Sequence, residues 1–428
     1  MAEWYLDFVD EGHRESPDEL LALFRVEPAE GMGLREAAGR IASESSIGTW
    51  TELTTMDERK RGLMAKAYRL KAPFVWIAYP AELFEPGNMP QILSSIAGNV
   101  FGMKAVRNLR LEDVRWPPSI IRSFRGPGLG IDGVRKMFRV RKRPLTATVP
   151  KPKVGMSEEE HARAGYEAWS GGVDLLKDDE NLSSQRFNRF EKRARLSFKM
   201  RDRAERETGE RKGYLINITA ETNEMVRRAR LVSELGGEHV MVDILTAGWS
   251  ALQTIREECQ DLGLAIHAHR AFHAAFTRNP AHGMSMIAVA KVSRLVGVDQ
   301  LHIGTAIGKL EAPPEEVVEL RRILAEGKNA EGRGLLGQDW MGVKPVFPVS
   351  SGGLHPGLIP EIIKMLGTDI IIQVGGGVWG HPGGGRAGAA AVRQAIDAAM
   401  EGVDLEEYAE GAPELRAALD TWGKTRPR

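Results

Sequence analysis

Eight short apolar runs, each ending on polar or glycine residues, constrain the fold of this 428-residue chain more than any other feature. They begin only after about residue 145, and segments long enough for helices, such as 159–172 and 224–237, separate them. Eight strand–helix repeats predict a (β/α)8 barrel of the TIM type, hence an α/β fold. The runs are LTATVPKPK (145–153), VDLLKDDE (173–180), YLINITAE (214–221), HVMVDIL (239–245), LAIHAHR (264–270), QLHIGTA (300–306), VFPVSSGG (346–353) and IIIQVGGG (370–377).

The first part of the chain, from about residue 18 to 120, has a mixed pattern. Residues 17–28 read as a helix, residues 74–80 (FVWIAYP) read as a strand, and charged or helix-like segments lie between and after them. This order predicts a small α+β domain of ferredoxin-like type with an antiparallel sheet. A connector rich in Pro, Gly and basic residues leads out of it. We therefore expect an N-terminal α+β domain over 1–125 and a barrel domain with C-terminal helices over 126–428.

Composition and charge exclude several classes of protein. The 58 Lys and Arg residues balance the 58 Asp and Glu residues, so nothing indicates a nucleic acid or an acidic membrane surface as partner. The single cysteine, Cys259, excludes an intramolecular disulfide. The N-terminus lacks a basic segment followed by an apolar one, and no run is long enough to cross a bilayer. These features predict a cytoplasmic protein.

Polar residues collect at the carboxyl ends of the predicted strands, where a barrel of this type carries its active site. They are Lys151 and Lys153, Lys177 with Asp179 and Glu180, His267, His269 and Arg270, His302, Ser351 with Gly352 and Gly353, and Gly375 to Gly377.

The second of these strand ends, LLKDDE, allows two interpretations. Strand alternation places Lys177 and Asp179 on one side and turns Asp178 away, while Glu180 can swing inward. The first interpretation is a buried ion pair. The second is a Mg²⁺ site in which two carboxylates supply hard oxygen ligands and a carbamate, formed by CO2 on the lysine, supplies a third. Local chemistry alone favours the ion pair, because carboxylates stabilise the ammonium form. The polar groups on the other strand ends favour the metal site.

The glycine-rich strand ends are either phosphate sites or plain turns. SSGG and VGGG follow the seventh and eighth strands, the usual place for a phosphate in this fold. GGGVWG (375–380) also matches G-x-G-x-x-G, the dinucleotide fingerprint. We reject that reading, because HPGGGRAG interrupts the required helix start and Asp397 falls within a helical pattern.

Two further segments carry candidate residues. The H-x-H of HAHRAFH (267–273) could bind zinc, as in metal-dependent hydrolases, but those carry the H-x-H on the first strand and the lysine on the fourth. The opposite order here favours a structural role for His267 and His273, while Arg270 suits a phosphate. Lys309, in GTAIGKLE (304–311), is either a solvated lysine or part of a glycine-hinged lid over a substrate.

Together these segments resemble the large subunit of ribulose-1,5-bisphosphate carboxylase/oxygenase (RuBisCO). The resemblance covers about residues 20 to 410, follows the family's order and is nearest the archaeal-type form III branch. It rests on KPK (151–153), GGVDLLKDDEN (171–181), HRAFH (269–273), GTAIGKLE, SSGGLHPG (350–357) and GGGVWGHP (375–382), with ESSIGTWTEL (44–53) and GNVFGMK (98–104) near the N-terminus.

The resemblance implies a mechanism and a set of residue roles. The activity would be carboxylation, with some oxygenation, of D-ribulose 1,5-bisphosphate to two 3-phosphoglycerates through a Mg²⁺-bound enediolate. Lys177 would carry the activating carbamate and, with Asp179 and Glu180, hold Mg²⁺. Lys151 and His269 would move protons, and Lys309 would close over CO2. The substrate would contact Glu44, Thr49, Trp50, Asn99, Lys153, Arg270, His302, Ser351, Gly352, Gly353, Gln373, Gly375 and Gly376.

The resemblance also implies an assembly. Glu44 and Asn99 would come from a second subunit, so a homodimer with shared active sites would be the smallest working unit. Dimers could assemble further, and no small subunit is expected. The main alternative is a RuBisCO-like enolase or isomerase that acts on a related sugar phosphate, and a non-catalytic sugar-phosphate binder is a third. The presence of every charged site residue favours the carboxylase.

Overall fold

The computed structural model describes residues 4–307, 313–332 and 334–426, which form two compact units. The first unit contains Met1–Gly126, Phe272–Val296 and Glu326–Val343, and the second contains Pro127–Ala271, Gly297–Ala325 and Lys344–Arg428. Two segments from the second half of the chain therefore belong to the same unit as the N-terminal sheet.

The first unit is built on a five-stranded sheet in the order β10-β4-β1-β3-β2. Strands β1 (Glu19–Pro28), β2 (Lys66–Lys71), β3 (Phe74–Pro80) and β4 (Val106–Arg115) pair antiparallel, as predicted, and β10 (Gly283–Met284) adds a short parallel edge to β4. The other elements are η1 (Trp4–Phe8), α1 (Leu34–Glu44), α2 (Glu58–Arg61), η2 (Ala81–Leu83), α3 (Met89–Ile96), η3 (Asn99–Gly102), α4 (Pro118–Arg122), α11 (Ala274–Thr277), α12 (Met286–Val296), β12 (Lys328–Asn329) and β13 (Gln338–Asp339).

The helix predicted over residues 17–28 is wrong, because this segment forms β1. Leu20 to Phe24 are buried without interruption, and β1 lies between β3 and β4 in the middle of the sheet. A central strand covered on both faces reads as a continuous apolar run rather than an alternating one. Periodicity alone cannot separate such a run from a buried helix.

The second unit is a closed barrel of eight parallel strands in the order β5-β6-β7-β8-β9-β11-β14-β15, which confirms the predicted TIM barrel. Seven of the strands fall within one predicted run each, and β7 begins one residue before its run, at Gly213. All eight are shorter than the runs, since the polar ends of the runs lie in loops. The strands are β5 (Leu145–Thr148), β6 (Leu175–Lys177), β7 (Gly213–Asn217), β8 (His239–Asp243), β9 (Ala265–His269), β11 (Gln300–His302), β14 (Phe347–Ser351) and β15 (Ile371–Gln373).

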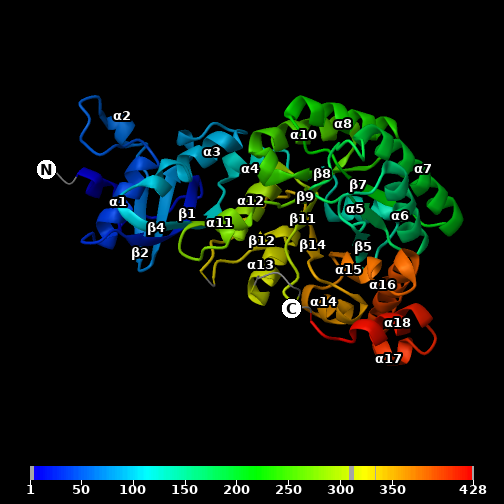
Figure 1. Ribbon diagram of the computed structural model, residues 1–428. Helices are drawn as coiled ribbons and strands as arrows, with labels where there is room; N and C mark the ends of the chain where they lie inside the picture. The colour runs from blue at the N-terminus through cyan, green and yellow to red at the C-terminus, as the bar shows by residue number, and fades with distance from the viewer. Residues whose placement is uncertain (1–3, 308–312, 333, 427–428) are drawn as a thin grey trace. The chain divides into compact units, whose positions relative to one another are not determined.

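Helices surround these strands, and Figure 1 shows α6, α7, α8 and α10 outside β5 to β9. The helices are α5 (Gly130–Phe138), α6 (Glu158–Ser170), α7 (Phe190–Thr208), α8 (Thr222–Glu234), α9 (Ile244–Ala247), α10 (Trp249–Leu262), α13 (Pro314–Ala325), α14 (Ile359–Leu366), α15 (Gly376–Trp379), α16 (Gly384–Glu401), α17 (Leu405–Tyr408) and α18 (Pro413–Trp422), with the short η4 (Pro356–Leu358).

Helix α5 determines which end of the barrel can carry a site. Its Phe138 packs in one buried cluster with Leu145, Leu175 and Phe347, which are the first residues of β5, β6 and β14. The inside of the barrel at the amino ends of these strands is therefore filled with apolar side chains. The carboxyl ends, where the polar residues gather, are left for binding and chemistry.

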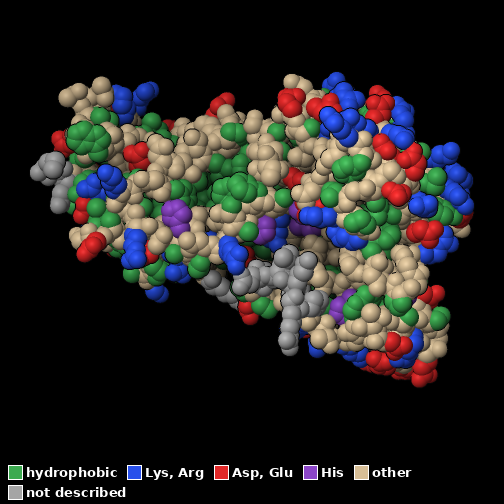
Figure 2. Space-filling model, viewed as in Figure 1, with side chains coloured by type: hydrophobic (Ala, Val, Ile, Leu, Met, Phe, Trp, Pro, Cys, Tyr) green, Lys and Arg blue, Asp and Glu red, His purple; other side chains and the backbone are tan. Residues whose placement is uncertain are grey.

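The surface agrees with the balanced charge of the sequence. On the face shown in Figure 2, Lys and Arg side chains are interspersed with Asp and Glu over the barrel helices. Among the described residues, no helix is both long and apolar enough to cross a membrane.

Candidate active site

Two amines and two carboxylates converge at the ends of β5 and β6. Lys177 is the last residue of β6 and is fully buried; its Nζ donates to the backbone oxygen of Asp178 at 2.9 Å and lies 3.5 Å from Oε2 of Glu180. Lys151, in the loop after β5, places its Nζ 3.4 Å from Oδ2 of Asp179. The two acids that the sequence selected therefore lie beside two of the four lysines that it selected.

Asp178 faces the opposite way, into the layer between β6 and helices α6 and α7. Its carboxylate pairs with Arg193 at 3.1 Å and lies 3.0 Å from Nε2 of His161. It also accepts hydrogen bonds from the hydroxyl of Tyr214 and the backbone N–H of Asn217. Burial opposes ionisation of Asp178, but the charge of Arg193 and the hydrogen bond to His161 outweigh it and lower its pKa to about 2.

His269, at the end of β9, joins the same group of residues. Its Nδ1 lies 2.7 Å from Oδ1 of Asp243, and its Nε2 lies 3.5 Å from Oε2 of Glu180. Burial would raise the pKa of Glu180, but His269 and Lys177 outweigh burial and lower it to about 2. Glu180 is therefore a carboxylate at neutral pH, and His269 has one ring nitrogen fixed by Asp243.

Asp243 was not among the residues selected from the sequence. The signal was present, because Asp243 is the last residue of β8 and thus lies at the same barrel end as the other candidates. Asp243 stands alone in the sequence, without a neighbouring histidine, lysine or glycine cluster, so no motif marks it. Its contact with His269 joins strands β8 and β9, which a single sequence does not reveal.

A row of hydrogen bonds connects three neighbouring strands of the barrel, β9, β11 and β14. Oε1 of Gln300 lies 2.7 Å from Nδ1 of His267, Nε2 of His267 lies 2.9 Å from Nε2 of His302, and Nδ1 of His302 lies 2.7 Å from Oγ of Ser351. Burial is the main cause that lowers the pKa of both histidines well below the usual value, so both are neutral. Since both ring nitrogens of His302 already have partners, the phosphate contact predicted for His302 requires one of these bonds to open.

Arg270 is better placed than His302 to bind an anion. It follows β9, it is buried, and burial lowers its pKa to about 10, so it keeps its charge at neutral pH. Among the described residues its guanidinium has no hydrogen-bond partner. A phosphate would supply the acceptors that this buried cation lacks.

The glycine-rich loops after β14 and β15 have the backbone that close contact with a ligand requires. Gly352 and Gly353 have φ values of 125° and 73°, which other residues adopt only with strain. A Cβ on Gly375 would lie 3.5 Å from Cε of Lys151, so this loop reaches the β5 end. Oε1 of Gln373, the last residue of β15, is buried without a partner among the described residues.

The remaining predicted residues divide into four groups. In the first unit, Nδ2 of Asn99 donates to Glu44 at 3.4 Å, the backbone oxygen of Thr49 accepts from Trp4, and Trp50 is 79% exposed. Lys153 is exposed, and it forms no hydrogen bond or ion pair among the described residues. Gly376 begins α15. Lys309 lies outside the described residues, so its role stays a prediction.

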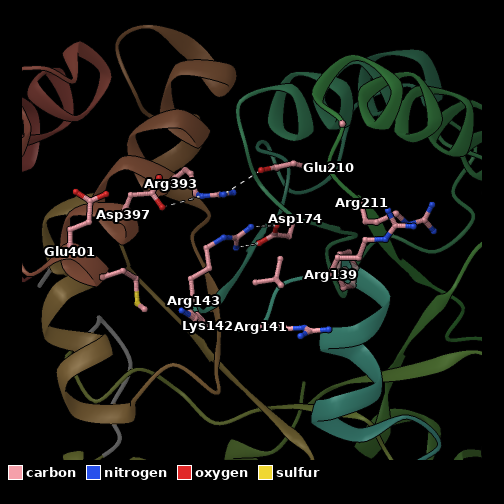
Figure 3. A pocket seen from close by; sticks show the side chains of 14 residues that line it. Arg139, Arg141, Lys142, Arg143, Asp174, Glu210, Arg211, Arg393, Asp397 and Glu401 are labelled. Atoms are coloured by element: carbon pink, nitrogen blue, oxygen red, sulfur yellow. Dashed lines mark hydrogen bonds and ion pairs between the residues drawn. The ribbon is translucent and has the colours of Figure 1, made fainter.

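A cavity of about 680 Å³ lies away from these residues, at the amino ends of the barrel strands (Figure 3). Its charged lining is paired internally, with Arg143 on Asp174 at 2.7 Å and Arg393 on Glu210 at 3.3 Å. Ion pairs at this end of a barrel serve stability rather than chemistry. We therefore place the site at the carboxyl ends.

Comparison with known proteins gives the same family over nearly the whole chain. The family described as the ribulose bisphosphate carboxylase large chain matches with its N-terminal domain over residues 7–120 and with its catalytic domain over residues 130–422. The ribulose bisphosphate carboxylase of Pyrococcus abyssi is 55% identical over 430 residues, covering 100% of this chain and 98% of its own length. That of Archaeoglobus fulgidus is 52% identical and covers 100% of both.

Comparison with solved structures gives the same family. A dimeric archaeal Rubisco from Hyperthermus butylicus has a TM-score of 0.94 at 53% identity, covering 98% of this chain and all of its own. An octameric Rubisco from Pyrococcus horikoshii, in complex with sulfate, has a TM-score of 0.93 at 54% identity, covering 99% of this chain and 98% of its own. The likeness extends over both compact units.

Proposed function

The chain belongs to the ribulose bisphosphate carboxylase large-chain family, and on that premise we propose that it adds CO2 and water to D-ribulose 1,5-bisphosphate and releases two 3-phosphoglycerates. The observation that carries the proposal is the group formed by Lys177, Glu180 and His269 at the ends of β6 and β9. A buried lysine against one carboxylate, with a second carboxylate next in sequence, is the local chemistry that a carbamate-assisted carboxylation needs.

The donor set fits Mg²⁺ once Lys177 is carbamylated. Among the described residues, no group of three or more His, Cys, Asp or Glu side chains is placed to hold a metal. Asp179 and Glu180 supply two hard oxygen donors, and a carbamate formed from the Lys177 amine and CO2, with release of a proton, adds a third. When bound, Mg²⁺ supplies positive charge that stabilises negative charge on the substrate's C2 and C3 oxygens.

The residues around this group bind the substrate and transfer protons. Arg270 and the glycine loops after β14 and β15 hold the two phosphates, which fixes the sugar carbons between them. His269, with its Nδ1 held by Asp243, presents Nε2 to move a proton at C3. Lys151 assists protonation near C2, and Lys309, which lies outside the described residues, is assigned to the incoming CO2. O2 competes for the same enediolate, which gives the oxygenase side reaction.

The proposal includes a homodimer with shared sites and no small subunit. Two of the solved relatives are a dimer and an octamer, and Glu44 and Asn99 already contact each other in the first unit. Mixed dimers of two inactive variants, Glu44→Ala and Lys177→Ala, should recover part of the activity, because one site per dimer would be intact. Verified mixed dimers without any activity would contradict shared sites.

Fixation of labelled CO2 tests the function directly. Purified protein, preincubated with CO2 and Mg²⁺ together, should incorporate label into 3-phosphoglycerate when ribulose 1,5-bisphosphate is added. Omitting either CO2 or Mg²⁺ from the preincubation should abolish the early rate. Consumption of ribulose bisphosphate without labelled phosphoglycerate would indicate an enolase or isomerase, and equal activity without Mg²⁺ would refute the proposed site.

A further inference from the structure

The C-terminal helix α18 is held at both ends by histidines, one in the loop after β14 and one just beyond α15, the short helix that follows β15. Nε2 of His381, in the loop after α15, donates to the backbone oxygen of Glu414 in the first turn of α18 at 2.9 Å. Nε2 of His355, in the loop after β14, donates to the backbone oxygen of Thr425, just beyond the last turn, at 2.8 Å. Both histidines are buried. One helix is thus attached to the loops that follow two different barrel strands.

The hydrogen-bonding direction is fixed at both histidines. Nδ1 of His381 accepts from the backbone N–H of Gly383 at 2.9 Å, so its proton must lie on Nε2. Nδ1 of His355 has no partner among the described residues, and its Nε2 faces a carbonyl, which can only accept. Burial lowers the pKa of His355, which keeps its ring neutral. Each histidine therefore donates to the main chain of the C-terminal segment.

Packing reinforces these two hydrogen bonds. The indole of Trp422 lies against the ring of His355, with ring centroids 5.8 Å apart. The same indole lies close to Gly380, because a Cβ on Gly380 would be 3.5 Å from Cζ2 of Trp422. A Cβ on Gly357 would meet the backbone oxygen of Gly423 at 2.0 Å, so the two backbones touch there. Trp422 therefore contacts the segment after β14 and the segment after β15 at the same time.

The two loops also touch each other beneath this helix. A Cβ on Gly377 would lie 2.6 Å from Cα of His355, which leaves no room for a side chain. Gly352, Gly353, Gly375 and Gly376, the predicted phosphate contacts, lie within a few residues of this crossing point along the chain. Figure 1 shows α14, α15, α16 and α18 gathered in this part of the barrel unit.

We infer that α18 with residues 423–426 acts as a brace that sets the spacing of the two phosphate-binding loops, with His355, His381 and Trp422 as its positioning residues. Backbone N–H groups bind a phosphate well only when the loops that carry them are held in place. None of the three side chains needs to touch the substrate. The inference rests on the proposed function, because it takes these loops to be the phosphate sites.

The test compares two changes that open the brace with a control on the same helix. Trp422→Ala removes the indole contact, and a chain ending at Trp422 removes the Thr425 carbonyl. Either should raise KM for ribulose 1,5-bisphosphate about tenfold, the equivalent of one lost positioning interaction, and leave kcat within about twofold. Trp422→Phe should restore most of the affinity. Asp420→Ala, an exposed change on α18, should behave as wild type.

A second measurement separates this inference from the proposed function. Inorganic phosphate, titrated calorimetrically, should bind more weakly to Trp422→Ala than to wild type, whether or not the wild-type protein carboxylates. An unchanged KM and unchanged phosphate affinity in both brace variants would overturn the inference. So would a joint loss of kcat, affinity and melting temperature that Trp422→Phe does not rescue, because that pattern describes a merely structural helix.

Discussion

Replacing Asp178 by asparagine should destabilise the fold far more than the same change at an exposed aspartate. In the native protein, Asp178 and Arg193 are both fully buried and lie 3.1 Å apart. Asparagine keeps the volume but leaves the guanidinium of Arg193 in the interior without a counter-charge. Breaking a buried ion pair from one side costs about 3 to 5 kcal/mol. We expect the free energy of unfolding to fall by at least about 3 kcal/mol.

The pKa of Asp178 gives a second estimate of how much this carboxylate stabilises the fold. It is about 2 in the folded protein, against an ordinary value of 3.8. Because the folded-state pKa is lowered, the ionised carboxylate stabilises the fold above pH 3.8, and this stabilisation is lost as the pH falls through about 2. The difference between the two pKa values corresponds to about 2 kcal/mol. This is smaller than the mutational estimate because protonation leaves a neutral acid in place, whereas asparagine also presents a donor to Arg193.

Urea unfolding at pH 7, followed by far-UV circular dichroism, measures the difference between wild type and Asp178→Asn. Asp261→Asn is the matched control, since Asp261 on α10 is exposed and has no partner among the described residues. Its free energy of unfolding should change by less than about 0.5 kcal/mol. If Asp178→Asn lost no more than this control, the buried pair would not anchor the β6 end, and the reasoning would be refuted.

Three further predictions follow from the site and the barrel core. Lys177→Met should abolish labelled CO2 fixation while the protein still folds, because the thioether cannot form a carbamate; fixation above background would contradict it. Asp243→Asn should lower kcat more than it raises KM, since it disturbs His269 and not substrate binding; equal kcat in steady-state kinetics would exclude that role. His239→Leu should flatten the fall in stability below pH 6.5, because burial lowers the pKa of His239 to about 3 and the folded state refuses a proton that the unfolded state accepts. Urea unfolding at pH 7 and pH 5 checks this, and parallel losses in wild type and variant would contradict it.

The barrel was predictable because each strand is marked locally. Runs such as 239–245 and 370–377 are apolar, short and bounded by polar or glycine residues, which is what a strand buried on both faces requires. The same property made the prediction for residues 17–28 wrong, because the continuous apolar run of residues 20–24 fits a buried helix as well as a buried strand. The local sequence therefore predicted strands correctly in the barrel, where eight regularly spaced repeats supported the assignment. It failed at residues 17–28, where no repeat did.

Contacts between distant segments were beyond local reasoning. Nothing in residues 283–284 predicts that they add an edge strand to β4, because a two-residue strand carries no periodic signal. The pairing of Asp243 with His269 and the attachment of His355 to Thr425 depend likewise on how strands and helices close in space. The candidate site residues themselves were found from motifs, whereas the residues that hold them in place were not.

The acidic run after Lys177 illustrates how position on a strand divides one kind of side chain between two tasks. Asp178 points into the α6–α7 layer and, by accepting the backbone N–H of Asn217 on β7, links the end of β6 to its neighbour. Asp179 and Glu180 lie beside Lys151 and Lys177 instead. An acid facing inward at all three positions would hold the Lys177 amine in its ammonium form, which cannot react with CO2. Turning the first acid away limits that charge and, through Arg193, fixes the backbone from which the other two project.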